Sequence, residues 1–173
     1  MFRILAISGS LRAQSTNTEL LRAAILVPST GTTVELYDGL GSLPHFNPDI
    51  EETALPVAAA ALRQQVGNAD ALIISTPEYA HGLPGSLKNA LDWLVGGPEM
   101  VGKRVALWHA STWSTHAPAQ LAEILRTMSA DVVEDATVVL NLRGKVWHAN
   151  EIAANDEMRA VLVAGLQRLA AHD

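Results

Sequence analysis

The fold of this chain is decided near its start, by FRILAISGSLRAQSTNTELLRAA at residues 2–24. Phe2 opens a nearly unbroken apolar run that continues to Ile7, which predicts a strand buried on both faces. A polar loop follows, and Ser15 or Thr16 is positioned to cap a helix. The apolar stripe of that helix comprises Leu20, Leu21, Ala24 and Ile25. Hydroxyls, an arginine and free helix-start N–H groups suit the loop to holding a phosphate.

This loop matches neither of the two best-known phosphate-binding motifs. The G-x-x-x-x-G-K-[ST] motif of nucleotide triphosphatases does not occur, and Gly9 stands alone where a dinucleotide-binding loop needs three glycines. Side-chain hydroxyls rather than glycine backbone would therefore surround the anion, which suits a terminal monophosphate. The alternative interpretation is that these are ordinary turn and capping residues.

The composition narrows the class of protein. At 173 residues the chain has the length of one domain, 1–173, and nearly half of its residues are apolar. A formal net charge of −6 argues against nucleic-acid binding, and the lack of cysteine excludes disulfides, thiol catalysis and cysteine metal sites. Because we find neither a signal peptide nor an apolar run of the ~20 residues that a membrane helix needs, we expect a soluble cytoplasmic protein without a membrane partner.

Strands and helices alternate along the rest of the chain. Further strands are predicted at residues 33–37, 71–75, 105–109 and within 132–140, and helices at 55–67, 86–95, 119–128 and 156–171. Residues 38–53, rich in Gly, Pro, Asp and Asn, are predicted to form an ordered surface loop. Five strands separated by helices predict a three-layer α/β/α fold. Its parallel sheet would have the flavodoxin-like order 2-1-3-4-5, with the ligand crevice at the carboxyl ends of the strands.

A second polar loop reaches the same edge of the predicted sheet. Residues 76–86, TPEYAHGLPGS, form an unusually long connection between a strand and a helix. Their prolines and glycines restrict the backbone, while Tyr79 and His81 offer a ring face and a polar group. Such a loop can present backbone N–H and C=O groups to a planar heteroaromatic ring at a low entropic cost. The alternative is a connection whose Pro and Gly only end the strand.

The two loops together carry a family resemblance. GSLRAQSTN at 9–17 and TPEYAHGLPGSLKNALDW at 76–93 resemble the NADPH-dependent FMN reductase family, which includes quinone, azo-dye and chromate reductases. The resemblance covers residues 2–140. It implies a flavodoxin-like fold, bound FMN, NADPH or NADH as reductant, and assembly into a homodimer or homotetramer. The apolar helix at 87–95 offers a surface for such a partner.

The resemblance also implies which residues hold FMN. The phosphate would be bound by Ser10, Arg12, Ser15, Asn17 and Thr18. The isoalloxazine ring would be lined, mainly through backbone atoms, by Pro77, Glu78, Tyr79, His81 and Gly82. Ser111 would reach the edge of the ring.

Two features depart from the family's pattern. Ala80 stands where many relatives have Asn, which removes one polar contact near the flavin. Residues 109–120, HASTWSTHAPAQ, replace a glycine-rich stretch. Trp113 in that segment is either a wall of the pocket or a surface or interface residue.

The implied function is an NAD(P)H oxidoreductase that transfers hydride through FMN to a quinone, azo compound, free flavin or similar small-molecule acceptor. No residue is assigned as catalytic. His81 is the candidate proton donor, with a structural hydrogen bond to the loop as the alternative. The six histidines lack the close spacing of a zinc motif, so no metal site is expected. The alternative functions are an electron carrier and a flavin-free scaffold of the same fold.

Overall fold

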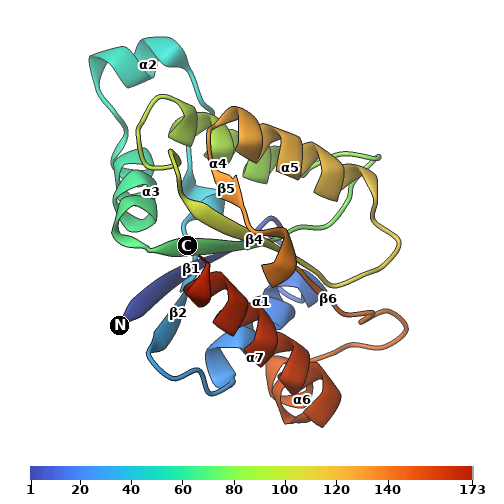
Figure 1. Ribbon diagram of the computed structural model, residues 1–173. Helices are drawn as coiled ribbons and strands as arrows, with labels where there is room; N and C mark the ends of the chain where they lie inside the picture. Colours follow the sequence, from blue (N-terminus) through green and yellow to red (C-terminus); the bar gives the residue numbers. More distant parts are fainter. Residues whose placement is uncertain (173) are drawn as a thin grey trace.

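The computed structural model describes residues 1–172 and has a central parallel sheet with helices on both faces (Figure 1). The main strands are β1 (Phe2–Ser8), β2 (Thr32–Tyr37), β3 (Ala71–Ser75), β4 (Arg104–His109) and β5 (Asp131–Val132). They lie in the order β2-β1-β3-β4-β5, and every pairing is parallel. The predicted flavodoxin-like order 2-1-3-4-5 is therefore confirmed.

Two groups of helices cover the sheet. One face carries α1 (Thr16–Leu26), α6 (Ala149–Ala154) and α7 (Asp156–Ala171). The other face carries α3 (Val57–Asn68), α4 (Gly85–Val95) and α5 (His116–Thr127), as Figure 1 shows. Within residues 1–172, every helix is too short or too polar to cross a membrane.

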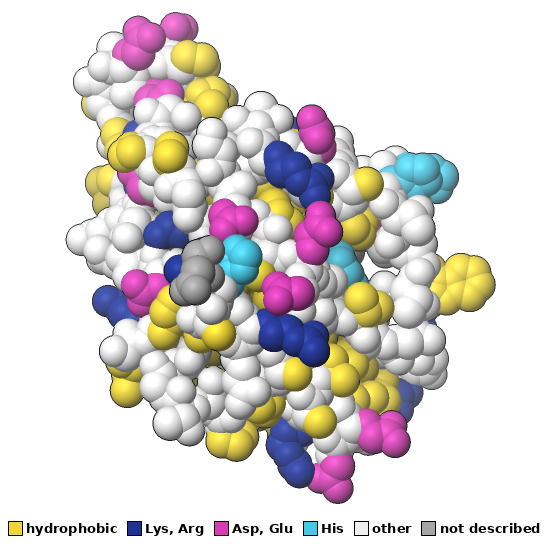
Figure 2. Space-filling model, viewed as in Figure 1, with side chains coloured by type: hydrophobic (Ala, Val, Ile, Leu, Met, Phe, Trp, Pro, Cys, Tyr) yellow, Lys and Arg dark blue, Asp and Glu magenta, His cyan; other side chains and the backbone are white. Residues whose placement is uncertain are grey.

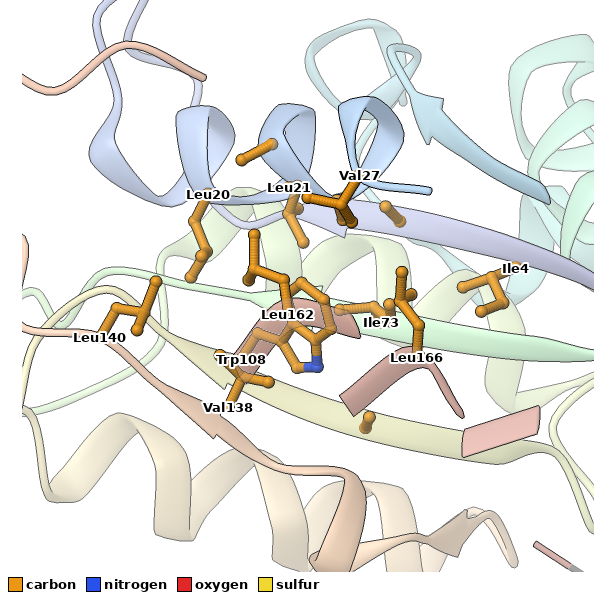
Figure 3. Close-up of a cluster of buried hydrophobic side chains, with 14 of the residues drawn as sticks. Ile4, Leu20, Leu21, Val27, Ile73, Trp108, Val138, Leu140, Leu162 and Leu166 are labelled. Atoms are coloured by element: carbon orange, nitrogen blue, oxygen red, sulfur yellow. The ribbon is translucent and has the colours of Figure 1, made fainter. Parts of the chain in front are cut away.

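The apolar run of β1 is continuous because both of its faces are buried. Ile4 and Ala6 pack into the hydrophobic cluster beneath α1 and α7, while Leu5 and Ile7 pack into the cluster beneath α3 and α4. At the centre of the first cluster lies Trp108 of β4, surrounded by aliphatic side chains from both α1 and α7 (Figure 3). Its buried indole Nε1–H donates a 3.2 Å hydrogen bond to the carbonyl oxygen of Ala136.

The structure corrects the sequence prediction in three segments. The predicted loop 38–53 contains the short 3₁₀ helix Leu40–Ser42 and the helix α2 (Pro48–Thr53), at whose start the Asn47 side chain accepts the Asp49 N–H at 3.0 Å. The predicted last strand within 132–140 is divided into β5 and β6 (Val138–Val139) by the 3₁₀ helix Glu134–Ala136, and β6 pairs with β4. The helix α6 was not predicted.

The carboxyl ends of β1 and β3 meet at one edge of the sheet, where the site is built. Ser8 pairs with Ser75, and the next residue, Gly9, donates its N–H to the Ser75 carbonyl oxygen at 2.8 Å. A Cβ added at Gly9 would lie 2.3 Å from Thr76 Oγ1. Glycine is therefore required here because the two loops touch, not because the turn needs a positive φ.

Candidate functional site

The start of α1 presents unused N–H groups at the ligand edge. The Ser15 side chain caps the helix by accepting from the Thr18 N–H at 3.4 Å, and the Thr18 hydroxyl bonds Ser8 Oγ at 2.7 Å. This arrangement leaves the first-turn N–H groups of Thr16 and Asn17 without intrahelical partners. The Asn17 side chain is held across the edge, because Ser75 Oγ donates to its Oδ1 at 2.9 Å. The geometry suits an anion at this end.

The loop after β3 is anchored to α5 by Glu78. The Glu78 Oε2 atom accepts the N–H groups of His116 at 2.8 Å and Ala117 at 2.9 Å, the first two residues of α5. These bonds, above all the one from Ala117, lower the pKa of the Glu78 carboxyl group. Glu78 is therefore ionised at neutral pH and supplies the helix cap that the local sequence of α5 lacks.

Next to Glu78 the chain makes a tight two-residue turn. Tyr79 and Gly82 exchange two backbone hydrogen bonds of 3.0 Å, and the residues between them, Ala80 and His81, have φ values of 49° and 59°. Two positive φ values in such a turn define type I′, which favours Asn and Gly rather than Ala and His. The His81 ring stacks on the His116 ring with centroids 4.3 Å apart.

A cleft of about 480 Å³ opens where these loops converge. Its walls come from the start of α1, the loop after β3, the loop after β4 and a later segment, residues 142–145. The size is typical of small-molecule and cofactor sites. His109, at the end of β4, also lines the cleft, and its burial lowers the pKa of its imidazole so that the ring is neutral at pH 7.

Residues 142–145 form a wall of the cleft that we did not predict. The Arg143 guanidinium lies 5.1 Å from the centroid of the Trp113 ring, a cation–π contact at the rim. Trp113 is 74% exposed yet lines the cleft, so it is a rim residue rather than a buried wall. The sequence signal for this wall is the run Arg143, Gly144, Lys145 after the last strand, because that strand ends at the ligand edge of the sheet.

A second cavity of about 230 Å³ adjoins the cleft. Arg12 and Ser15 line it together with Trp147, and the two cavities share Thr16 and Lys145. The Lys145 ammonium lies 3.7 Å from the centroid of the Trp147 ring. The two cavities thus form one continuous surface around the start of α1.

The predicted site residues lie at several different places around the cleft. The main cleft is lined by Asn17, Pro77, Glu78 and Ser111. The second cavity is lined by Arg12 and Ser15. Loop-supporting hydrogen bonds are made by Ser10, whose Oγ accepts from the Arg12 N–H, and by Thr18. The exposed turn beside the cleft contains Tyr79, His81 and Gly82, which are not among the residues that line it.

Comparison with known proteins agrees with this geometry. The sequence profile of the family described as NADPH-dependent FMN reductase matches residues 2–144. An NAD(P)H-dependent FMN reductase of Pseudomonas aeruginosa is 32% identical over 172 residues, covering 96% of this chain and 92% of that protein. A quinone reductase of Escherichia coli K12 is 32% identical over 112 residues, covering 63% of this chain and 60% of the relative.

A solved structure shows the same arrangement along the whole chain. FerB of Paracoccus denitrificans, a flavoenzyme NAD(P)H:acceptor oxidoreductase, superposes with a TM-score of 0.75 at 25% identity and covers 99% of both chains. The family match, the full-length relative and this structural neighbour all agree with the motifs and the strand order described above. The chain belongs to the NADPH-dependent FMN reductase family.

Proposed function

We propose that this protein is an FMN-dependent NAD(P)H oxidoreductase that passes hydride to a quinone, azo compound, free flavin or similar small acceptor. The observation that carries the proposal is the cleft in which the open N-terminus of α1 faces the anchored loop after β3. The relatives support it, since they include an FMN reductase and a quinone reductase with substantial coverage of this chain.

The residues present fit both the phosphate and the planar ring of FMN. An anionic phosphate fits the N–H groups of Thr16 and Asn17, with Arg12 and Lys145 as the nearby cations. The contact at Gly9 brings the loops after β1 and β3 together, so that one ligand can touch both. The loops that contribute Pro77 and Ser111 line the same cleft and would hold the planar ring between them.

Bound FMN would supply the hydride-accepting ring, and the work of the protein is to hold that ring and its approach in a fixed geometry. Glu78 keeps the loop after β3 in place through its two bonds to α5. His109 adds no positive charge to the cleft at neutral pH. His81 lies on the exposed turn beside the cleft, and donation of a proton by its imidazole to an acceptor stays a prediction.

Steady turnover tests the proposal. Purified protein reconstituted with FMN should oxidise NADPH or NADH continuously when a benzoquinone is supplied, and the flavin absorbance band should bleach when the quinone is omitted. An electron carrier would bind FMN but show little turnover. A protein that takes up no FMN would overturn the oxidoreductase and carrier interpretations together.

We further propose one FMN-binding domain spanning the chain, a cytoplasmic location and a homodimer or homotetramer. The apolar stripe of α4 does not support the assembly, because Leu87, Leu91 and Leu94 are buried in the protein's own core. Exposed apolar side chains at Val95 and Val101, directly after that stripe, are a better basis for a subunit contact. Light scattering on the purified protein measures the subunit number.

A further inference from the structure

Three metal-ligating side chains converge beside the cleft although they lie far apart in the sequence. Glu78, His81 and His116 each place a ligand atom within 4.8 Å of the other two. Glu78 and His81 belong to the loop after β3, and His116 is the first residue of α5. We propose that these three residues form a binding site for a divalent metal ion that prefers imidazole ligands, such as Zn²⁺.

The carboxylate is positioned as a ligand before any metal arrives. Both backbone N–H groups at the start of α5 bond the same oxygen of Glu78, Oε2, so the other oxygen, Oε1, is available. This carboxylate is ionised at neutral pH, as a metal ligand must be. A hydrogen-bonded carboxylate of fixed orientation is a common feature of metal sites.

The two imidazoles can reach the distances that a metal requires. Zinc binds imidazole nitrogen at about 2.0–2.1 Å and carboxylate oxygen at about 2.0–2.2 Å, so its ligand atoms lie about 3.4 Å apart in a tetrahedral site. The present separations are at most 4.8 Å, and His81 and His116 are both exposed. Rotation of these rings out of their stacked arrangement is therefore enough to close the site, while the turn and the helix that carry them stay in place.

The ligand types select the class of metal. Two imidazoles and one carboxylate suit Zn²⁺, Cu²⁺ or Ni²⁺, whereas Mg²⁺ and Ca²⁺ require sites made mainly of oxygen. Three protein ligands leave a coordination position for water or another small ligand. When filled, the site would connect the turn of Tyr79 and Gly82 to α5 by a bond that does not depend on the flavin.

Zinc titration of the untagged, FMN-loaded protein, stripped of metal with a chelator, tests the site. Isothermal calorimetry should detect one Zn²⁺ per chain, and Mg²⁺ at the same concentration should give no binding heat. Because each removes one of three ligands, His81→Gln and His116→Gln should each weaken Zn²⁺ binding at least about tenfold. His45→Gln removes an exposed histidine from a different loop and should leave the affinity unchanged.

The spectrum of bound Co²⁺ provides a second measurement. Cobalt in the site should show the strong visible bands of four-coordinate geometry, and both His81→Gln and His116→Gln should abolish them. If Zn²⁺ binds equally well to the wild type and to these two variants, or if no site is detected in the wild type, the proposal is wrong and the two rings form only a stacked pair. Circular dichroism of each variant establishes that its fold is intact.

Discussion

Gly9→Ala would show whether the loops after β1 and β3 together form the cofactor cleft. The added Cβ would lie 2.3 Å from Thr76 Oγ1 and 2.8 Å from Thr76 Cβ. Thr76 is buried and β-branched, so its side chain has little freedom to turn away. Ordinary van der Waals contact begins at 3.4 Å, and the two loops must therefore separate by about 1 Å.

This separation should lower both the stability of the protein and its affinity for FMN. We expect the free energy of unfolding of the FMN-free protein to fall by about 1–3 kcal/mol, as overpacking of a dense region does. FMN affinity should fall at least about tenfold, because a shift of ~1 Å misaligns polar groups that must contact one ligand at the same time. Urea denaturation measures the stability, and quenching of FMN fluorescence measures the affinity.

Gly85→Ala is the matched control for this experiment. It is the same substitution at the first residue of α4, directly after the loop that follows β3, but nothing lies within 4 Å of the added Cβ. Stability and FMN affinity should both stay close to the wild type. If Gly9→Ala also binds FMN with unchanged affinity, the contact between the two loops does not shape the site and the reasoning is refuted.

Three further substitutions test the phosphate-binding end of the cleft, the Glu78 cap of α5 and the turn that contains Ala80. Arg12→Ala should weaken FMN binding by about 1.5–3 kcal/mol, the value of a charge-assisted contact, while Arg3→Ala at the other end of β1 should leave it unchanged in the same titration. Because folding lowers the pKa of Glu78, its carboxylate stabilises the fold above about pH 5 and this contribution is lost as acid protonates it. The melting temperature of Glu78→Gln should therefore change less between neutral and acidic pH than that of the wild type. Ala80→Asn should raise the free energy of unfolding by about 0.5–1 kcal/mol, since Asn adopts a positive φ more readily than Ala; a lower melting temperature would contradict this.

The elements that the sequence predicted correctly are those whose causes lie within a few neighbouring residues. The strands β1 and β3 are visible as apolar runs because both of their faces are buried. The start of α1 is visible because its cap, Ser15, is adjacent in sequence. Alternation and right-handed crossovers predicted a parallel sheet with helices on both faces, and the size of the chain favoured the flavodoxin-like order among the doubly wound ones.

The features that escaped prediction depend on contacts between distant segments. The helix α5 begins at His116, before the predicted start at residue 119, because Glu78 supplies its cap from another loop. The last strand is divided because the 3₁₀ helix at Glu134–Ala136 packs beneath α7. The pairing of His81 with His116 has the same origin, since only the fold brings these two rings together.

The charges around the cleft suggest a role for residues 142–145, the wall that the sequence did not predict. The chain has a net charge of −6, and Figure 2 shows acidic and basic side chains interspersed over one face of the molecule. Around the start of α1, by contrast, Arg12, Arg143 and Lys145 border the two cavities. Within residues 1–172, only Lys145 of these three forms an ion pair, a 3.4 Å contact with Glu151.

Arg12 and Arg143 form no ion pair within residues 1–172, so their positive charges are not neutralised by a neighbouring carboxylate. FMN and NAD(P)H are both anionic, and a local positive potential would raise their rate of association while the remaining surface repels them. Arg143 additionally lies over the Trp113 ring at the rim of the cleft. On the proposed function, the segment 142–145 would therefore attract the anionic reductant, whereas the loops after β1 and β3 would hold the cofactor.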